Sequence, residues 1–144
     1  MMTTIATDGV TIAGDGKITS GDTITDLNRV KVFRLPDGTA IGYAGDLIST
    51  SAFHSWMVAG ADANNRPTLS ENFAAVRING SSTVLLYDDE YRSVEMPVPY
   101  ATGSGRNFAL AAMDAGLPPK DAVAIAAKRD VYSGGRVRSV TVKL

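Results

Sequence analysis

The sequence predicts an α+β domain in which helices cover antiparallel sheets. A strong hairpin signal, Asp8-Gly9, joins two apolar segments near the start of the chain. Blocks of predicted strands then alternate with blocks of predicted helices, whereas repeated βαβ units would alternate single elements. The chain has 144 residues, a length that fits one compact domain, and residues 1–144 are treated as a single domain.

The first third of the chain is predicted to consist of short strands. Apolar and β-branched residues dominate its segments, and turn sequences such as Pro36-Asp37-Gly38 separate them. Residues 17–28 are rich in Thr, Asp and Gly, so we expect loop or short edge pieces there. The expected strands are residues 3–7, 10–13, 29–35 and 39–44.

The rest of the chain is predicted to combine helices with further strands. The first helix begins at an Asp46 cap, runs to about Val58 and is ended by Gly60. Residues 60–72 are polar and are expected to form a flexible stretch. The later elements are strands at 76–78, 83–87 and 91–95, helices at 107–115 and from Pro118-Pro119 onward, and a final strand at 137–142.

Composition excludes several classes of function. The formal net charge is -1 and the basic residues are scattered, so we expect no nucleic-acid partner. The absence of cysteine excludes a thiol nucleophile and a disulfide framework. The single histidine, His54, cannot build a typical zinc site, and we expect it to be a partly buried packing residue. Signal-peptide features and transmembrane-length apolar runs are missing, so a cytoplasmic protein without membrane contact is expected.

Thr3 is a candidate nucleophile. A threonine hydroxyl can use its own α-amine as a base, but only when that threonine is the first residue of the chain. Met1 and Met2 precede Thr3, so this chemistry requires their removal. Taken alone, Thr3 is more simply an ordinary strand residue. The choice depends on the partners that the rest of the chain supplies.

Four further motifs are weak individually. Gly14-Asp15-Gly16 is a turn, and Lys31 is a strand lysine of the kind that usually faces solvent. Gly103-Ser104-Gly105 precedes a helix without the spacing of a nucleotide-binding glycine motif. Residues 129–135, with the sequence Arg-Asp-Val-Tyr-Ser-Gly-Gly, could simply end a helix.

Taken together and in order, these motifs resemble the proteolytic β subunits of proteasomes and the bacterial HslV peptidase, which are N-terminal-nucleophile hydrolases. The opening Thr3-Thr4-Ile5 and residues 10–16 resemble the HslV start, and residues 129–135 are closer to proteasome β subunits. The resemblance covers most of the chain except about residues 60–98, which marks a shortened variant. It implies a four-layer αββα sandwich of antiparallel sheets, the Ntn-hydrolase fold.

The resemblance implies a threonine-type endopeptidase. Thr3 would be the nucleophile, and its freed α-amine the general base. Lys31, from the segment Val30-Lys31-Val32, would lie next to that amine and favour its neutral form by like-charge repulsion. Asp15 would pair with Lys31 and hold it charged. The backbone N–H of Gly45 would donate to the oxyanion.

The same resemblance assigns supporting residues. Ser104, Asp130 and Ser133 would form a hydrogen-bonding group around the α-amine and a bound water. Thr19 would pair its backbone with the substrate as an added strand. The residues expected to border the specificity pocket are Ile18, Arg29, Tyr43 and Leu47.

Partners also follow from the resemblance. The substrate would be a peptide or an unfolded protein, and the particle a homo-oligomeric ring, with an ATPase unfoldase as a further candidate partner. No cofactor and no catalytic metal is expected, while a structural cation near residues 130–133 is left open. Asp46 stands beside the proposed oxyanion donor, where its charge would oppose catalysis unless it caps the following helix.

Processing and function retain alternatives. Translation could begin at Met2, with an aminopeptidase then removing that residue, or Thr3 could cleave the Met2–Thr3 bond itself by autoprocessing. A second functional hypothesis is a catalytically silent ring or scaffold subunit. A third is a small-molecule amidase that uses the same nucleophile.

Overall fold

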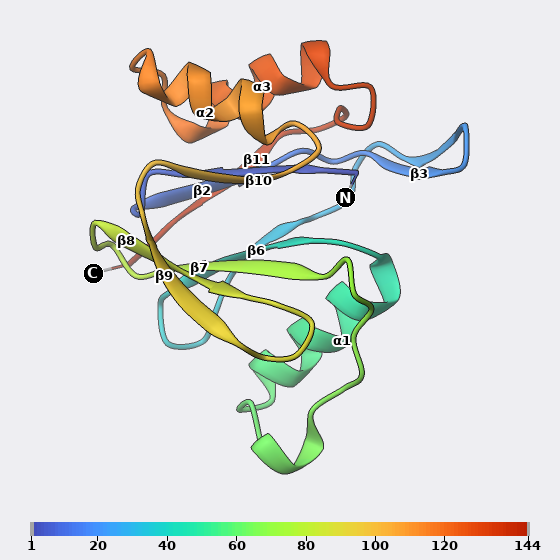
Figure 1. Ribbon diagram of the computed structural model, residues 1–144, viewed down its shortest axis with the longest axis vertical. Coiled ribbons are helices and arrows are strands. Elements are labelled where there is room, and N and C mark those ends of the chain that lie inside the picture. The colour runs from blue at the N-terminus through green and yellow to red at the C-terminus, as the bar shows by residue number, and fades with distance from the viewer. Residues whose placement is uncertain (1, 144) are drawn as a thin grey trace.

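The computed structural model describes residues 2–143 and stacks two antiparallel sheets between two helical layers (Figure 1). This arrangement confirms the predicted αββα fold class. Two helices from the C-terminal third of the chain form one outer layer, and a helix from the first half forms the other. The helices are α1 (Leu47–Val58), α2 (Arg106–Asp114) and α3 (Pro119–Arg129).

The first sheet is covered on both faces. Its strands are β1 (Thr4–Thr7), β2 (Thr11–Gly14), β10 (Tyr100–Gly103) and β11 (Arg138–Thr141), in the antiparallel order β10-β1-β2-β11. Ala6 and Ala13 pack with the buried residues of α2 and α3, whereas Ile5 and Ile12 pack toward the second sheet. Because successive side chains of a strand point to opposite faces, small residues meet the helices and large ones fill the space between the sheets.

The second sheet lies between the first sheet and α1. Its strands are β5 (Val32–Arg34), β6 (Ala40–Ala44), β7 (Ala74–Ile78), β8 (Thr83–Tyr87) and β9 (Ser93–Pro97), paired in that order. Tyr43 packs with Phe53 of α1 in an aromatic cluster, while Ala40 faces the first sheet. At Gly42 a Cβ atom would lie 2.9 Å from Ile5 Cγ2, so glycine allows β6 to approach the first sheet there.

A two-stranded hairpin extends from the first sheet. It consists of β3 (Ile18–Ser20) and β4 (Thr23–Asp26), and most of its residues are exposed. Figure 1 shows β3 projecting beyond the helical layers on the side where the N-terminus lies. The expectation of loop or short edge pieces over residues 17–28 is therefore confirmed.

Helix α1 has the cap that the sequence predicted. The Asp46 carboxylate accepts from the Ser49 N–H at 3.0 Å and from the Ser70 hydroxyl. These hydrogen bonds, with that from Ser70 the strongest, hold the pKa of Asp46 below its ordinary value. Asp46 therefore caps the helix, which resolves the alternative left open above. The short 3₁₀ turn η1 (Ala63–Asn65) is the helical structure between α1 and β7.

The observed elements differ from the expectations at several places, and three of these differences have an identifiable cause. Strand β10 was not expected, and it forms because Tyr100–Gly103 pairs with β1 at the edge of the first sheet. Strand β9 begins later than expected, because the Asp88 carboxylate accepts from the Arg92 N–H at 2.9 Å and prolongs the turn. Residues 29–31 lie outside β5, since the Arg29 N–H donates to the Gly16 carbonyl at 2.9 Å instead.

Candidate active site

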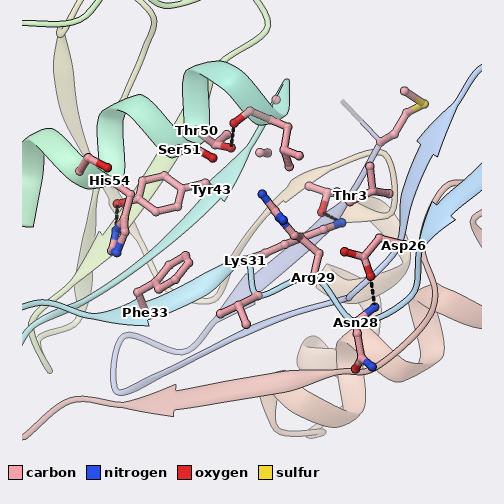
Figure 2. A pocket seen from close by; sticks show the side chains of 17 residues that line it. Thr3, Asp26, Asn28, Arg29, Lys31, Phe33, Tyr43, Thr50, Ser51 and His54 are labelled. Atoms are coloured by element: carbon pink, nitrogen blue, oxygen red, sulfur yellow. Dashed lines mark hydrogen bonds between the residues drawn. The ribbon is translucent and has the colours of Figure 1, made fainter.

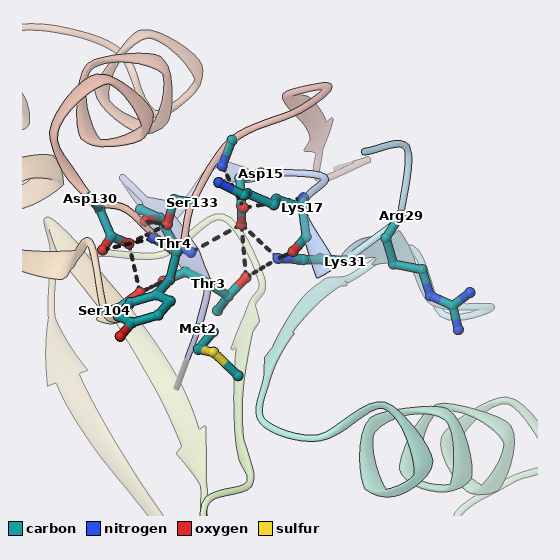
Figure 3. A network of polar contacts seen from close by, with 12 residues as sticks. Met2, Thr3, Thr4, Asp15, Lys17, Arg29, Lys31, Ser104, Asp130 and Ser133 are labelled. Atoms are coloured by element: carbon teal, nitrogen blue, oxygen red, sulfur yellow. Dashed lines mark hydrogen bonds and ion pairs between the residues drawn. The ribbon is translucent and has the colours of Figure 1, made fainter. Parts of the chain in front are cut away.

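Thr3 lies directly before β1, with its side chain buried between two charged residues (Figure 3). Its hydroxyl donates to Asp15 Oδ1 over 2.8 Å and accepts from Lys31 Nζ over 2.5 Å. The strand pairing produces this arrangement. Strands β1 and β2 are antiparallel with Ile5 opposite Gly14, so residues just before β1 lie beside residues just after β2.

The Asp15 carboxylate is held by donors from several parts of the chain. Oδ1 accepts from Lys31 Nζ at 2.9 Å and from the Thr4 N–H at 3.1 Å. Oδ2 accepts from the N–H groups of Gly134 at 3.0 Å and Lys17 at 3.3 Å. The side chain has 0% exposure, and a buried charge requires such partners. These contacts tie β2, the segment before β5 and the loop after α3 to one point.

Lys31 directs its ammonium group at Thr3. Besides Thr3 Oγ1 and Asp15 Oδ1, Nζ donates to the Lys17 carbonyl at 2.8 Å, so each of its three N–H groups can have an acceptor. Burial lowers the pKa of Lys31, and the Asp15 carboxylate opposes that shift. The sequence expectation placed Lys31 beside the α-amine of Thr3. In the structure Lys31 contacts the hydroxyl.

A second polar cluster lies on the other side of the Thr3 backbone. Asp130 Oδ2 accepts from Ser104 Oγ at 2.6 Å and from Ser133 Oγ at 2.5 Å. Ser104 Oγ also approaches the Thr3 carbonyl at 3.2 Å, and Ser133 Oγ lies 2.7 Å from Thr4 Oγ1. The cluster therefore holds the Thr3 carbonyl and the Thr4 hydroxyl, and it does not contact the Thr3 hydroxyl.

Gly45 lies at the end of β6, beside the pocket that Thr3 lines. Its φ of +129° is a conformation that side chains disfavour, and a Cβ atom would lie 3.0 Å from the Asn72 carbonyl oxygen and from Phe73 Cα. Glycine is thus required by the local backbone and by packing against the segment before β7. Among residues 2–143, its N–H has no hydrogen-bond acceptor.

A cavity of about 380 Å³ opens between Thr3, the segment before β5 and α1 (Figure 2). Thr3, Lys31 and Gly45 line it together. All four residues that were expected to border a specificity pocket line this cavity: Ile18, Arg29, Tyr43 and Leu47.

Thr19 does not line the cavity. Its hydroxyl donates to Met2 Sδ at 3.1 Å, and Met2 itself is among the lining residues. The residue that precedes Thr3 therefore lies between β3 and the cavity. Met1 is outside the described residues.

The structure also reveals residues that sequence reasoning missed. The Lys17 carbonyl accepts from Lys31 Nζ, and Lys17 Nζ donates to the Val131 carbonyl at 3.0 Å. These two contacts link the two loops around Asp15. His54 is partly buried and stacks on Phe33 with ring centroids 4.0 Å apart, as a packing histidine should. It also lines the cavity, which the sequence did not indicate.

Protonation in the aromatic wall of the cavity follows from burial. Burial lowers the pKa of His54 and raises that of Tyr43, so at neutral pH the imidazole is neutral and the phenol protonated. The Tyr43 hydroxyl lies 2.9 Å from His54 Nδ1 and can donate to it.

Two further features, a metal-ligand cluster and a membrane-spanning helix, are not found in residues 2–143. No group of three or more His, Cys, Asp or Glu side chains there could hold a metal ion. No helix within the same residues has the length and apolar character needed to cross a membrane.

No protein-family model matches the sequence. Solved structures do match, over nearly the whole of both chains. HslV from Trypanosoma brucei has a TM-score of 0.70 at 19% identity, covering 99% of each chain. Thiobacillus denitrificans BPH has a TM-score of 0.68 at 19% identity, covering 99% of this chain and 97% of that one. BPH in complex with epoxomicin has a TM-score of 0.69 at 17% identity, covering 99% of each chain. The chain therefore has the HslV fold.

Proposed function

We propose that this protein is a threonine-type peptidase whose nucleophile is the hydroxyl of Thr3. The observation that carries the proposal is the position of Thr3 Oγ1, 2.5 Å from Lys31 Nζ and 2.8 Å from Asp15 Oδ1 at a cavity wall. An ordinary strand threonine has no need of a buried ion pair around its hydroxyl. An ammonium that donates to this oxygen stabilises the negative charge that develops on it.

The reaction requires an α-amine at Thr3. A free α-amine has a pKa of about 7.7–8.0. The Lys31 ammonium, which donates to the hydroxyl of the same residue, would favour the neutral amine by like-charge repulsion. The neutral amine takes the Oγ1 proton while Oγ1 attacks a peptide carbonyl carbon. The amine then gives the proton to the departing peptide nitrogen, leaving an ester on Thr3. Water, deprotonated by the same amine, hydrolyses that ester and restores the hydroxyl.

The tetrahedral intermediate carries its charge on the former carbonyl oxygen. The Gly45 N–H, which has no acceptor among the described residues and lies at the same cavity, is the donor that we assign to it. The cluster of Asp130, Ser104 and Ser133 holds the Thr3 backbone, so it would fix the amine against the hydroxyl. A substrate strand would run beside Thr19, where Met2 lies now.

Removal of the residues before Thr3 is part of the proposal. While Met2 is attached, the Thr3 nitrogen is an amide and cannot act as a base. Met2 lines the cavity, so the Met2–Thr3 bond lies at the proposed site and self-cleavage is one route to the mature chain. An aminopeptidase is the other route.

Assembly and partners extend the proposal. The sequence resemblance implies a homo-oligomeric ring, and the chain exposes large apolar side chains that such contacts could cover, including Ile48 at 84% and Val131 at 72% exposure. Peptides or unfolded proteins would be the substrates. Delivery by an ATPase unfoldase and a cytoplasmic location belong to the same proposal.

The first experiment compares two forms of the protein, one released from a cleavable fusion so that Thr3 is its first residue, and one retaining Met2. We expect the Thr3-initiated form to cleave fluorogenic peptides and the Thr3→Ala variant to be inactive. Equal activity of Thr3→Ala would contradict the proposal. Ring assembly without activity in any form would favour the silent scaffold. Hydrolysis of small free amides but not of peptides would favour the amidase.

A further inference from the structure

Arg29 lines the cavity, and its charge has no partner among residues 2–143. Its backbone is fixed on both sides, since its N–H donates to the Gly16 carbonyl at 2.9 Å and its carbonyl accepts from Arg138 Nη1 at 3.1 Å. Its guanidinium takes part in none of the side-chain hydrogen bonds or ion pairs found among residues 2–143. Figures 2 and 3 both show the side chain extending into the space that faces α1.

The other charged side chains of the cavity wall are Lys31 and Asp26, and neither pairs with Arg29. Lys31 is paired with Asp15 at 2.9 Å. Asp26, the acidic lining residue, accepts from the Asn28 N–H at 2.7 Å and forms no ion pair within 4.0 Å with Arg29. The guanidinium of Arg29 is therefore the cation of this wall that has no acceptor among residues 2–143.

We propose that the cavity selects substrates with an acidic side chain on the residue whose carbonyl Thr3 attacks, and that Arg29 is the specificity-determining residue. The inference rests on the proposed function and names its substrate class. With the attacked carbonyl between Thr3 Oγ1 and the Gly45 N–H, the side chain on the adjoining α-carbon is the substrate group nearest the cavity that these residues line.

A carboxylate matches this wall better than the alternatives. A guanidinium binds a carboxylate through two parallel N–H···O bonds, and such charge-assisted bonds are about twice as strong as neutral ones. A basic side chain would be repelled, and an aliphatic one would desolvate Arg29 without giving it an acceptor. Phe33, Tyr43 and Leu47 also line the cavity and can pack against the methylene groups of the bound residue.

The test uses the Thr3-initiated protein and peptides that differ only at the residue before the cleaved bond, with Glu, Asp, Gln, Leu, Phe or Lys in that place. The Glu and Gln peptides are nearly the same size, so their ratio of kcat/KM isolates charge. Loss of a charge-assisted bond of about 1.5–3 kcal/mol corresponds to roughly ten- to a hundredfold in kcat/KM. We expect the Glu peptide to exceed the Gln peptide by at least about tenfold.

Variants assign the preference to Arg29. In Arg29→Ala the Glu/Gln ratio should fall to near one, and in Arg29→Glu the preference should move to the Lys peptide. A merely structural role for Arg29 would lower the rates for all peptides without reversing the charge preference. Arg92→Ala, in the turn between β8 and β9 with a 71% exposed side chain, is the matched control and should keep the ratio.

Two different results would overturn the inference. Preference for Leu, Phe or Lys by the unaltered protein, or an unchanged Glu/Gln ratio in Arg29→Ala, would contradict the acidic specificity while leaving the peptidase intact. If the protein cleaves none of the peptides and Thr3 does not react with epoxomicin, both the proposed function and this inference are contradicted.

Discussion

Lys31 and Arg29 are two cations, two residues apart, that line the same cavity and differ in every contact of their side chains. Lys31 is 7% exposed and donates to Thr3, Asp15 and Lys17. Arg29 is partly buried and has no side-chain partner among the described residues. The difference separates two uses of charge. A cation bound to the protein's own groups can act on the reacting hydroxyl, whereas an unmatched cation remains available to a substrate.

Replacing Lys31 should have the largest effect. Lys31→Met removes the ammonium from Thr3 Oγ1 and should lower kcat/KM by about 10²–10⁴-fold, the range found for well-placed proton-transfer and charge-stabilising groups. It also leaves Asp15 charged and buried without a cation. Peptidase assays of the Thr3-initiated protein measure the activity, and Lys120→Met on the exposed face of α3 is the matched control. Activity within tenfold of the unaltered protein would break the comparison.

Removing the charge of Asp15 should chiefly lower stability. Asp15→Asn leaves the Lys31 ammonium buried without a counterion, and breaking a buried pair in this way costs about 3–5 kcal/mol. Urea unfolding measures the free energy of unfolding. The control is Asp37→Asn, because the ion pair of Asp37 with Arg77 is partly exposed and should contribute about 0–1 kcal/mol. An equal decrease in the free energy of unfolding in the two variants would show that the buried Asp15 pair contributes no more to stability than the exposed pair.

The next effect is the pH dependence of stability and activity, which should reflect the loss of the Lys31 proton. Burial lowers the pKa of Lys31 below its ordinary value of 10.5, so in the folded protein Lys31 loses its proton at a lower pH than in the unfolded chain. Between the two pKa values the unfolded chain binds more protons, and the free energy of unfolding therefore rises with pH there. Activity should fall over the same window, because Thr3 loses its ammonium donor.

A pH profile of kcat/KM tests this prediction. The acid limb should reflect the pKa of the Thr3 α-amine, at or below the ordinary value of about 7.7–8.0. The alkaline limb should reflect the loss of the Lys31 proton. In Asp15→Asn the alkaline limb should move to lower pH, since the opposing carboxylate is lost. An alkaline limb at or above 10.5 would contradict the assignment of Lys31.

Replacing Arg29 should have the smallest effect on stability. Arg29→Ala removes no side-chain hydrogen bond or ion pair of the described residues and keeps both backbone contacts of residue 29. The free energy of unfolding should change by less than about 0.5 kcal/mol, as for substitutions that break no specific contact. Urea unfolding decides the matter. A loss as large as that of Asp15→Asn would mean that Arg29 has a structural partner and is not reserved for substrate.

Local sequence signals predicted much of the fold. Asp8-Gly9 indicated the first hairpin, Asp46 the start of α1, and the alternation of strand and helix blocks the layered arrangement. These signals act within a few residues, so a single sequence carries them. Strand β10 could not be predicted in this way, because Tyr100–Gly103 is a strand through its pairing with β1, far away in the chain.

The candidate site divides in the same manner. Thr3, Asp15 and Lys31 could be named because their motifs occur in a specific order, although their roles remain predictions. The contact of Lys31 with the hydroxyl, rather than the amine, depends on how the two sheets pack against each other. The lack of a partner for Arg29 among residues 2–143, and the place of His54 in the cavity wall, depend on tertiary packing. No short sequence motif encodes them.

The most direct test of the central claim is to map where epoxomicin reacts. The Thr3-initiated protein, the form retaining Met2 and the Thr3→Ala variant would each be incubated with epoxomicin, the compound bound in one BPH structure, and analysed by intact mass and peptide mapping. We predict one adduct per chain, on Thr3, in the Thr3-initiated protein alone. An adduct on another residue, or peptidase activity that persists in Thr3→Ala, would contradict the account.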